Sequence, residues 1–215
     1  MKDPYVYEDT GTLKNKLGIK DYEELRKAES DISFVRLLTV DRDVDCKKFD
    51  LEYVKNIHKY ILHDIYDWAG EFRTVPMEKA EDVLGGDTVR YAYPKEIEPE
   101  AEECLNELNR INWNSKEESD KAMCFSKLIA KLWQVHPFRD GNTRTIVTYA
   151  FRFAEEHGFK MDRNLLLDNF EYVRKALVKA SDGEYSEYKY LYKIVNDSIQ
   201  RGKNNNKEDE EIEER

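Results

Sequence analysis

Apolar residues recur at helical spacing along most of the chain, which indicates amphipathic helices. Asp21 begins the first predicted helix, and Glu24 lies three residues later at the position of a capping box. Later helical patterns cover the stretches 50–67, 96–112, 115–136, 142–157, 164–180 and 184–201. Three of them end at Gly70, Pro137 and Gly158, because glycine is favoured just after the last residue of a helix and proline cannot continue one. The pattern predicts a mainly α bundle of about seven helices with short connections.

Residues 71–93 differ from the rest, because their pattern is typical of short strands. Two runs rich in β-branched and aromatic residues, 72–75 and 89–93, flank the sequence Gly85-Gly86-Asp87, which favours a tight turn. We therefore expect a β-hairpin flap with a long, charged tip.

Composition excludes several classes of protein. The 215 residues carry a net charge of −10 without a visible basic patch, so nucleic acid is not an expected partner. No apolar run approaches the roughly 18 residues that a membrane-spanning helix needs, so no membrane partner is expected either. The three cysteines form no CxxC motif, and the N-terminus has no apolar signal segment. We therefore expect a cytoplasmic protein with reduced thiols.

The stretch from His136 to Arg144 combines residue types that suit phosphate transfer. His136 ends one predicted helix and can act as a general base, and Asp140 in the following loop can hold Mg2+. Gly141 and the free N–H groups at the start of the next helix can surround an anion, and Arg144 can donate several hydrogen bonds to a phosphate. A histidine before a proline usually belongs to an ordinary helix–turn–helix, but this ordered combination favours a phosphate-transfer site. Phe138 is expected to point into the core and anchor the loop.

The same stretch resembles the Fic motif, HxFx(D/E)GN(G/K)RxxR. The matching residues are His136, Phe138, Asp140, Gly141, Asn142 and Arg144. Segments 13–19 and 57–75 resemble the family's opening segment and the helix that leads into its flap, so the resemblance covers roughly residues 5–195. It implies a Fic fold over residues 1–200. The expected parts are an N-terminal segment with helices at 1–49, the flap at 71–93, a catalytic helix–loop–helix at 115–158, and a disordered charged tail at 201–215.

The resemblance implies a protein adenylyltransferase, which transfers AMP from ATP to a Tyr, Thr or Ser hydroxyl of a target protein. His136 would deprotonate that hydroxyl, and Asp140 would hold the Mg2+ that bridges the nucleotide phosphates. The residues that would bind the nucleotide phosphates are Gly141, Asn142, Thr143 and Arg144. The flap would dock the target segment as an added strand. Its docking residues would be Thr74, Val75, Val89 and Tyr91.

Two positions depart from the motif. Thr143 stands where Gly is typical of AMP transferases and Lys is typical of members that transfer a phosphate from ATP, and the missing Lys favours AMP transfer. Val147 replaces the final Arg, which normally helps to seat the terminal phosphate, and Arg152 lies on another face of the helix. The alternatives are transfer of another nucleotide or a phosphate by the same fold, or a degenerate Fic protein that acts as a binding module.

Many family members inhibit themselves with a helix that carries (S/T)xxxE(G/N). The stretch from Thr74 to Glu78 begins such a motif, but Lys79 follows and the position lies in the flap. Inhibition would therefore come from a separate antitoxin-like chain or another mechanism.

Overall fold

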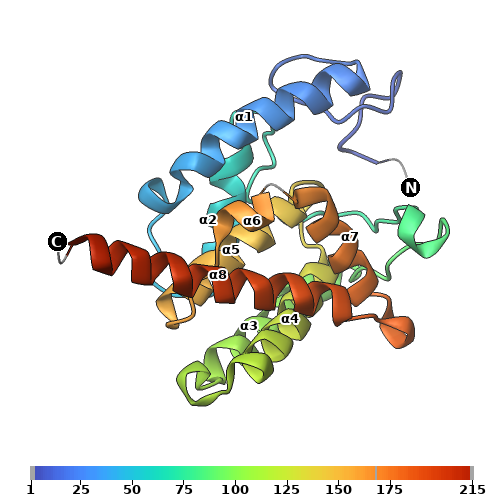
Figure 1. Ribbon diagram of the computed structural model, residues 1–215. Coiled ribbons are helices and arrows are strands. Elements are labelled where there is room, and N and C mark those ends of the chain that lie inside the picture. The colour runs from blue at the N-terminus through green and yellow to red at the C-terminus, as the bar shows by residue number, and fades with distance from the viewer. Residues whose placement is uncertain (1–2, 168, 214–215) are drawn as a thin grey trace.

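A computed structural model describes residues 3–167 and 169–213 of the chain (Figure 1). Over these residues the chain forms eight α-helices and no β-sheet, so the mainly α prediction is confirmed. The helices are α1 (Tyr22–Asp43), α2 (Leu51–Leu62), α3 (Ile97–Arg110), α4 (Glu118–Val135), α5 (Asn142–Glu156), α6 (Arg163–Leu167), α7 (Phe170–Ala180) and α8 (Lys189–Glu213). Short 3-10 turns occupy Asp82–Leu84 (η1), Pro94–Glu96 (η2), Trp113–Ser115 (η3) and Gly183–Tyr185 (η4). None of the helices in the described part is long and apolar enough to cross a membrane.

Local capping explains several helix boundaries. The Asp21 carboxylate accepts a hydrogen bond from the Glu24 amide at 2.9 Å, which confirms the predicted start of α1. Asp50 caps α2 in the same way. That helix ends at Leu62 rather than near residue 67, because the chain turns back there and the Ile65 amide bonds to the Leu62 carbonyl.

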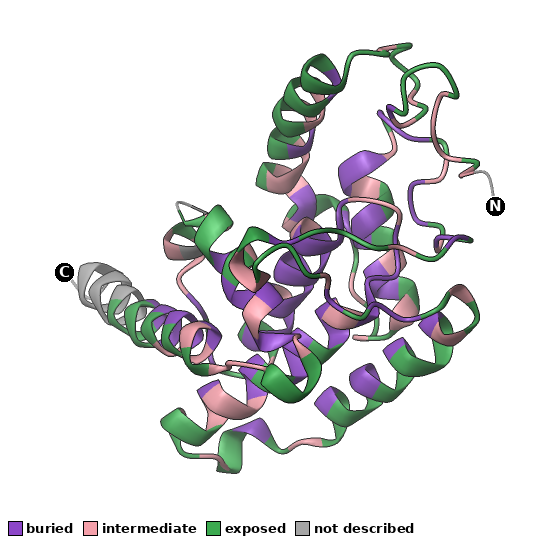
Figure 2. Cartoon of the chain, turned by 90° about the vertical axis from the view of Figure 1, so that its right-hand side faces the viewer, coloured by how far each residue is buried: buried purple, intermediate pink, exposed green. Residues whose placement is uncertain are grey.

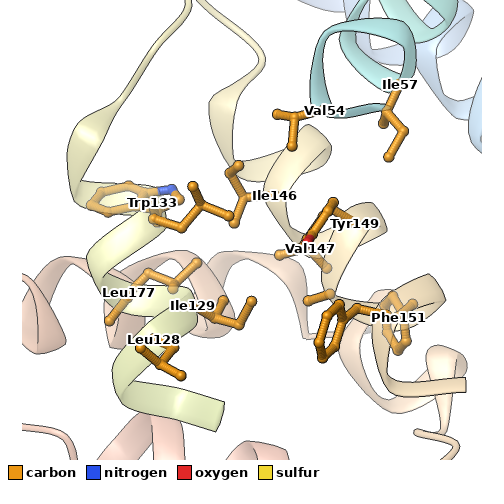
Figure 3. Close-up of a cluster of buried hydrophobic side chains, with 14 of the residues drawn as sticks. Val54, Ile57, Leu128, Ile129, Trp133, Ile146, Val147, Tyr149, Phe151 and Leu177 are labelled. Atoms are coloured by element: carbon orange, nitrogen blue, oxygen red, sulfur yellow. The ribbon is translucent and has the colours of Figure 1, made fainter. Parts of the chain in front are cut away.

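The core lies where α4 and α5 pack together, with α3 and α8 against α4 and with α2 against α5. Buried positions concentrate in the middle of this bundle (Figure 2). Figure 3 shows how side chains from four helices meet there: Leu128, Ile129 and Trp133 of α4, Ile146 and Tyr149 of α5, Val54 and Ile57 of α2, and Leu177 of α7. This packing fixes the end of α4 beside the start of α5, and the loop between them therefore has a defined place at one end of the bundle.

The prediction of a β-hairpin at 71–93 is wrong, because neither of its two expected strands forms. Over this flap the structure has one isolated antiparallel bridge, Ala80 with Thr88, and the turn η1. The reason is Arg73, a residue of the first expected strand that is almost fully buried. Its guanidinium donates to the carbonyls of Val75 at 2.8 Å and Ala92 at 2.5 Å, so these carbonyls bond to a side chain rather than across a ladder. The flap is therefore an irregular loop that is held by the buried side chain of Arg73.

The predicted boundary at residue 201 does not coincide with a helix end. The helix α8 continues to Glu213 and forms the long red helix of Figure 1. Gln200 and Lys203 both bond to Glu118 at the start of α4, which holds this part of α8 against the bundle.

Candidate active site

His136 follows the last residue of α4 in an unusual backbone conformation. Its φ of 51° makes it the one non-glycine residue with positive φ in the part of the chain that is described, and such a conformation costs roughly 1–2 kcal/mol. Arg73 stabilises it, because its Nε donates to the His136 carbonyl at 2.8 Å. The imidazole is buried and stacks on Tyr91 with ring centres 4.1 Å apart. Its Nδ1 is buried and has no hydrogen-bond partner.

The surroundings keep the His136 imidazole neutral. Burial, the Arg73 guanidinium and the Lys79 ammonium lower its pKa to about 3. A neutral imidazole can accept a proton, so its charge state suits a general base.

The loop after His136 is held by the side chain of Asn142. Its Nδ2 donates to the Phe138 carbonyl at 2.8 Å, and its Oδ1 accepts from the Phe138 amide at 2.9 Å. Phe138 has no exposed surface, as expected of a loop anchor. Because both polar atoms of Asn142 are engaged in this way, the residue contributes to an anion site through its backbone N–H rather than its amide.

His58 of α2 ties this loop to the start of the flap, and sequence reasoning missed this role. Its Nδ1 accepts a hydrogen bond from the Gly70 amide at 2.8 Å, and its Nε2 lies 3.0 Å from the Asp140 carbonyl. Since an amide can only donate, Nδ1 is unprotonated and Nε2–H donates to Asp140. The ring also stacks on Phe138 with centres 3.7 Å apart. The sequence signal for a buried role of His58 was its place on the apolar face of α2, next to Ile57.

Gly141 is required by the fit between this loop and α2. Its φ is 75°, and a Cβ at this position would lie 2.5 Å from Cδ1 of Leu62 and 3.4 Å from Nε2 of His58. Its amide donates to Oδ1 of Asp140 at 2.5 Å. The loop therefore approaches α2 as closely as a glycine allows.

The start of α5 offers backbone N–H groups for an anion. Gly141 is the N-cap and makes no side-chain capping bond, and the first N–H groups of any helix lack partners within the helix. Thr143 is buried, and its Oγ1 accepts a bond from the Trp133 indole at 2.9 Å. Thr143, like Asn142, therefore offers its backbone rather than its side chain.

Arg144 is already engaged with α1, which the sequence did not predict. Its guanidinium bonds to the Glu29 carboxylate and, at 2.7 Å, to the Ser33 hydroxyl, and its side chain is 17% exposed. Tyr66 donates to the same carboxylate. Burial and the neighbouring Asp140 raise the pKa of Glu29, while Arg144 and Tyr66 oppose the rise. The positive charge of Arg144 is thus largely balanced by the Glu29 carboxylate.

Asp140 is the open carboxylate of the loop, with a side chain that is 47% exposed. Its Oδ1 accepts from Gly141 and lies 3.7 Å from Nη2 of Arg144. No cluster of three or more metal-ligating side chains occurs among residues 3–167 and 169–213. A metal ion here would therefore take the remaining oxygen of Asp140 and complete its coordination with substrate and water oxygens, which is the habit of Mg2+.

A cavity of about 710 Å³ opens between α1, the flap, the start of α5 and α7, and the motif contributes Arg144 to its lining. Its charged lining includes Glu29 of α1, Lys79 and Glu81 of the flap, Arg144 of α5 and Arg174 of α7. The volume is within the range of small-molecule sites, about 300–1,000 Å³. A nucleotide-sized ligand can thus reach Arg144 and the flap together.

Comparison with known proteins identifies the family. The model of the Fic/DOC family matches residues 48–154. The chain belongs to the Fic/DOC family. The protein adenylyltransferase VbhT of Bartonella schoenbuchensis is 34% identical over 164 residues, which cover 74% of this chain and 32% of VbhT. A probable protein adenylyltransferase, y4lH of Sinorhizobium fredii, is 29% identical over 168 residues, covering 77% of this chain and 82% of y4lH.

Solved Fic domains share the fold. The N-terminal Fic domain of a Bartonella effector protein from Bartonella sp. AR 15-3 is 26% identical, with a TM-score of 0.71 over 90% of each chain. BepC of Bartonella tribocorum, solved with bound AMPPNP, has a TM-score of 0.71 at 22% identity over 90% of this chain and 95% of BepC. This Fic chain spans about a third of the length of VbhT, so it corresponds to one part of that longer relative.

Position 147 of this Fic chain faces the core. Val147 is 8% exposed and borders a small cavity of about 30 Å³ with Leu37, Val40 and Phe170. Val147 does not line the larger cavity. Arg152 bonds to the Asp41 carbonyl at 2.8 Å and is therefore committed to α1, as expected from its position on another face of α5.

The predicted docking residues of the Fic flap are mostly buried. Val75, Val89 and Tyr91 point inward, and only Thr74 of this set is exposed. The Thr74 amide donates to the Tyr5 hydroxyl at 3.1 Å. A target segment would therefore meet the backbone of the flap rather than these side chains.

Proposed function

We propose that this protein is a protein adenylyltransferase, which transfers AMP from ATP to a Tyr, Thr or Ser hydroxyl of a target protein. The observation that carries the proposal is the neutral, buried imidazole of His136 in a loop that leads, past the exposed Asp140, to the uncapped start of α5. The relatives VbhT and y4lH, named as a protein adenylyltransferase and a probable one, support it.

In the proposed reaction the target hydroxyl oxygen attacks the α-phosphorus of ATP. A new oxygen–phosphorus bond forms, the bond from the α-phosphorus to the bridging oxygen breaks, and pyrophosphate leaves. His136 takes the proton of the hydroxyl as the attack proceeds. The negative charge of a bound nucleotide raises the pKa of His136 from its low value and makes the imidazole a better base.

The start of α5 provides the electrostatic support for this transfer. Backbone N–H groups of Asn142 and Thr143 bind the phosphates, and the positive end of the helix favours their charge. Asp140 would hold Mg2+, which would neutralise negative charge on the nucleotide when bound. The single open carboxylate fits such a substrate-bridged ion.

We further propose that the target adds to the flap as an extended segment. Most of the flap backbone lies outside any ladder, so those of its N–H and C=O groups that are not bonded within the flap can pair with an incoming chain. Recognition through the backbone is tolerant of target sequence.

A separate antitoxin-like inhibitor stays a prediction of the resemblance. A cytoplasmic location stays a prediction as well, with which three free cysteines agree.

Transfer of isotopic label from ATP tests the proposal. The protein is incubated with Mg2+, a cell lysate and ATP labelled at either the α- or the γ-phosphate, and parallel reactions with GTP, CTP and UTP test the donor. We expect α-label on protein, a loss of about 10²–10⁴-fold in His136→Ala, and nucleotide binding by that variant close to wild type. His63→Ala, which alters a histidine at the end of α2 outside the cavity, is the matched control.

The binding-module alternative is favoured by two observations. Val147 provides no charge for a terminal phosphate, and Arg144 is paired with Glu29. Transfer of γ-label would instead indicate a phosphotransferase, and no transfer of either label would support the binding module.

A further inference from the structure

Among the described residues, four cations line the cavity: the exposed Arg26 of α1 and Lys79 of the flap, and the partly buried Arg144 of α5 and Arg174 of α7. Arg144 is only 17% exposed and bonds to both Glu29 and Ser33, and position 147 is an apolar residue that faces the core. A nucleoside triphosphate nevertheless brings more negative charge than the start of one helix compensates. Another cation of the cavity lining should therefore meet the end of the phosphate chain.

Arg174 of α7 lies in that lining and is partly open to the cavity. Its side chain is 26% exposed. Its Nη1 and Nη2 donate to the two carboxylate oxygens of Glu81 at 2.9 Å and 2.6 Å. A guanidinium has five N–H donors, so this bidentate pair uses two and leaves three. The pair with Glu81 thus leaves donors of the guanidinium free for a ligand.

The charge of Arg174 and its place in the cavity lining agree with this role. Burial lowers the pKa of the guanidinium, but the bonds to Glu81 and the charges of Tyr91 and Asp140 raise it on balance. The Arg174 guanidinium therefore carries its positive charge. The turn η1 packs against α7, and Arg174 lines the cavity together with Lys79 and Glu81 of the flap.

We propose that Arg174 of α7 binds the terminal phosphate of the nucleotide in place of the arginine that position 147 lacks. The proposal rests on the proposed function, because it assumes a nucleotide in this cavity. It assigns a phosphate-binding residue to α7 and to a part of the chain outside the Fic motif.

Calorimetric titration of ATP, ADP and AMP in Mg2+ tests the proposal. Arg174→Gln should weaken ATP binding by about 10- to 100-fold and AMP binding much less, because only ATP brings the terminal phosphate. Lys175→Gln removes the same charge from an exposed neighbouring site on α7 and should leave all three affinities near wild type. A thermal melt of each variant verifies that it is folded.

The competing explanation is that Arg174 only fastens the flap to α7. Glu81→Gln separates the two explanations, because it weakens the bridge and also removes a negative charge that repels phosphate. If Arg174 binds phosphate, Glu81→Gln keeps or improves ATP affinity while Arg174→Gln lowers it. Parallel losses in the two variants, or unchanged ATP affinity in Arg174→Gln, would overturn the inference while the wild-type protein still binds and transfers nucleotide. Absence of nucleotide binding by the wild-type protein would overturn the proposed function and this inference together.

Discussion

The close approach of the catalytic loop to α2 makes Gly141→Ala a sharp test of the site geometry. Two costs arise from the one added methyl group. A non-glycine residue at φ 75° costs roughly 1–2 kcal/mol. The methyl group would also lie 2.5 Å from Cδ1 of Leu62, and Leu62 is fully buried, so its side chain can move only by displacing its neighbours. Overpacking of this kind costs about 1–3 kcal/mol. The total is about 2–5 kcal/mol.

Gly11→Ala is the matched control for this change. Gly11 has a φ of 73°, and a Cβ built there meets nothing within 4 Å, so it carries only the backbone cost. Urea unfolding of the two variants should therefore differ by about 1–3 kcal/mol. The Gly141 variant should also lose transfer activity, because a shift of Leu62 or His58 moves the Asp140 carbonyl, to which His58 bonds. Equal destabilisation of the two variants, with activity kept, would refute the tight fit.

Three further predictions concern the same loop and helix. Asp140→Ala should weaken nucleotide binding more in Mg2+ than in EDTA, whereas equal weakening in both buffers would show that the carboxylate only caps the helix. Val147→Arg should destabilise the fold by about 2–5 kcal/mol without tightening ATP binding, because it buries an unpaired charge among apolar residues; Val147→Ile, which the adjacent cavity of about 30 Å³ can accept, should melt near wild type. His136 has a pKa of about 3 in the folded protein, against about 6.5 when unfolded, so the unfolded state binds its proton first as pH falls. The stability from this group is complete above about pH 6.5 and is lost towards pH 3, by up to about 1.4 kcal/mol per pH unit. Urea unfolding between pH 7 and 5 should therefore show a shallower loss in His136→Asn than in wild type, and identical slopes would contradict the neutral buried ring.

Much of the helical framework and the catalytic loop was predictable from the sequence. The Asp21 cap, the ends of α3 and α5 and the mainly α class follow from periodicity and capping, which involve residues within a turn or two of each other. The motif from His136 to Arg144 is contiguous, so its order along the chain already suggested a base, a metal ligand and a helix start.

Only the tertiary structure decided which distant side chains complete this loop. His58 bonds to the Asp140 carbonyl across 82 positions, and Glu29 pairs with Arg144 across 115. The strands of the flap failed for the same reason, because the carbonyls of its two segments are bound by the buried Arg73. Periodicity and propensity describe a residue's near neighbours, whereas these contacts depend on how α1, α2 and α7 dock on the bundle. The sequence alone therefore determined the helices and the chemistry of the loop, and packing decided which buried partners orient it and which cations remain available to a ligand.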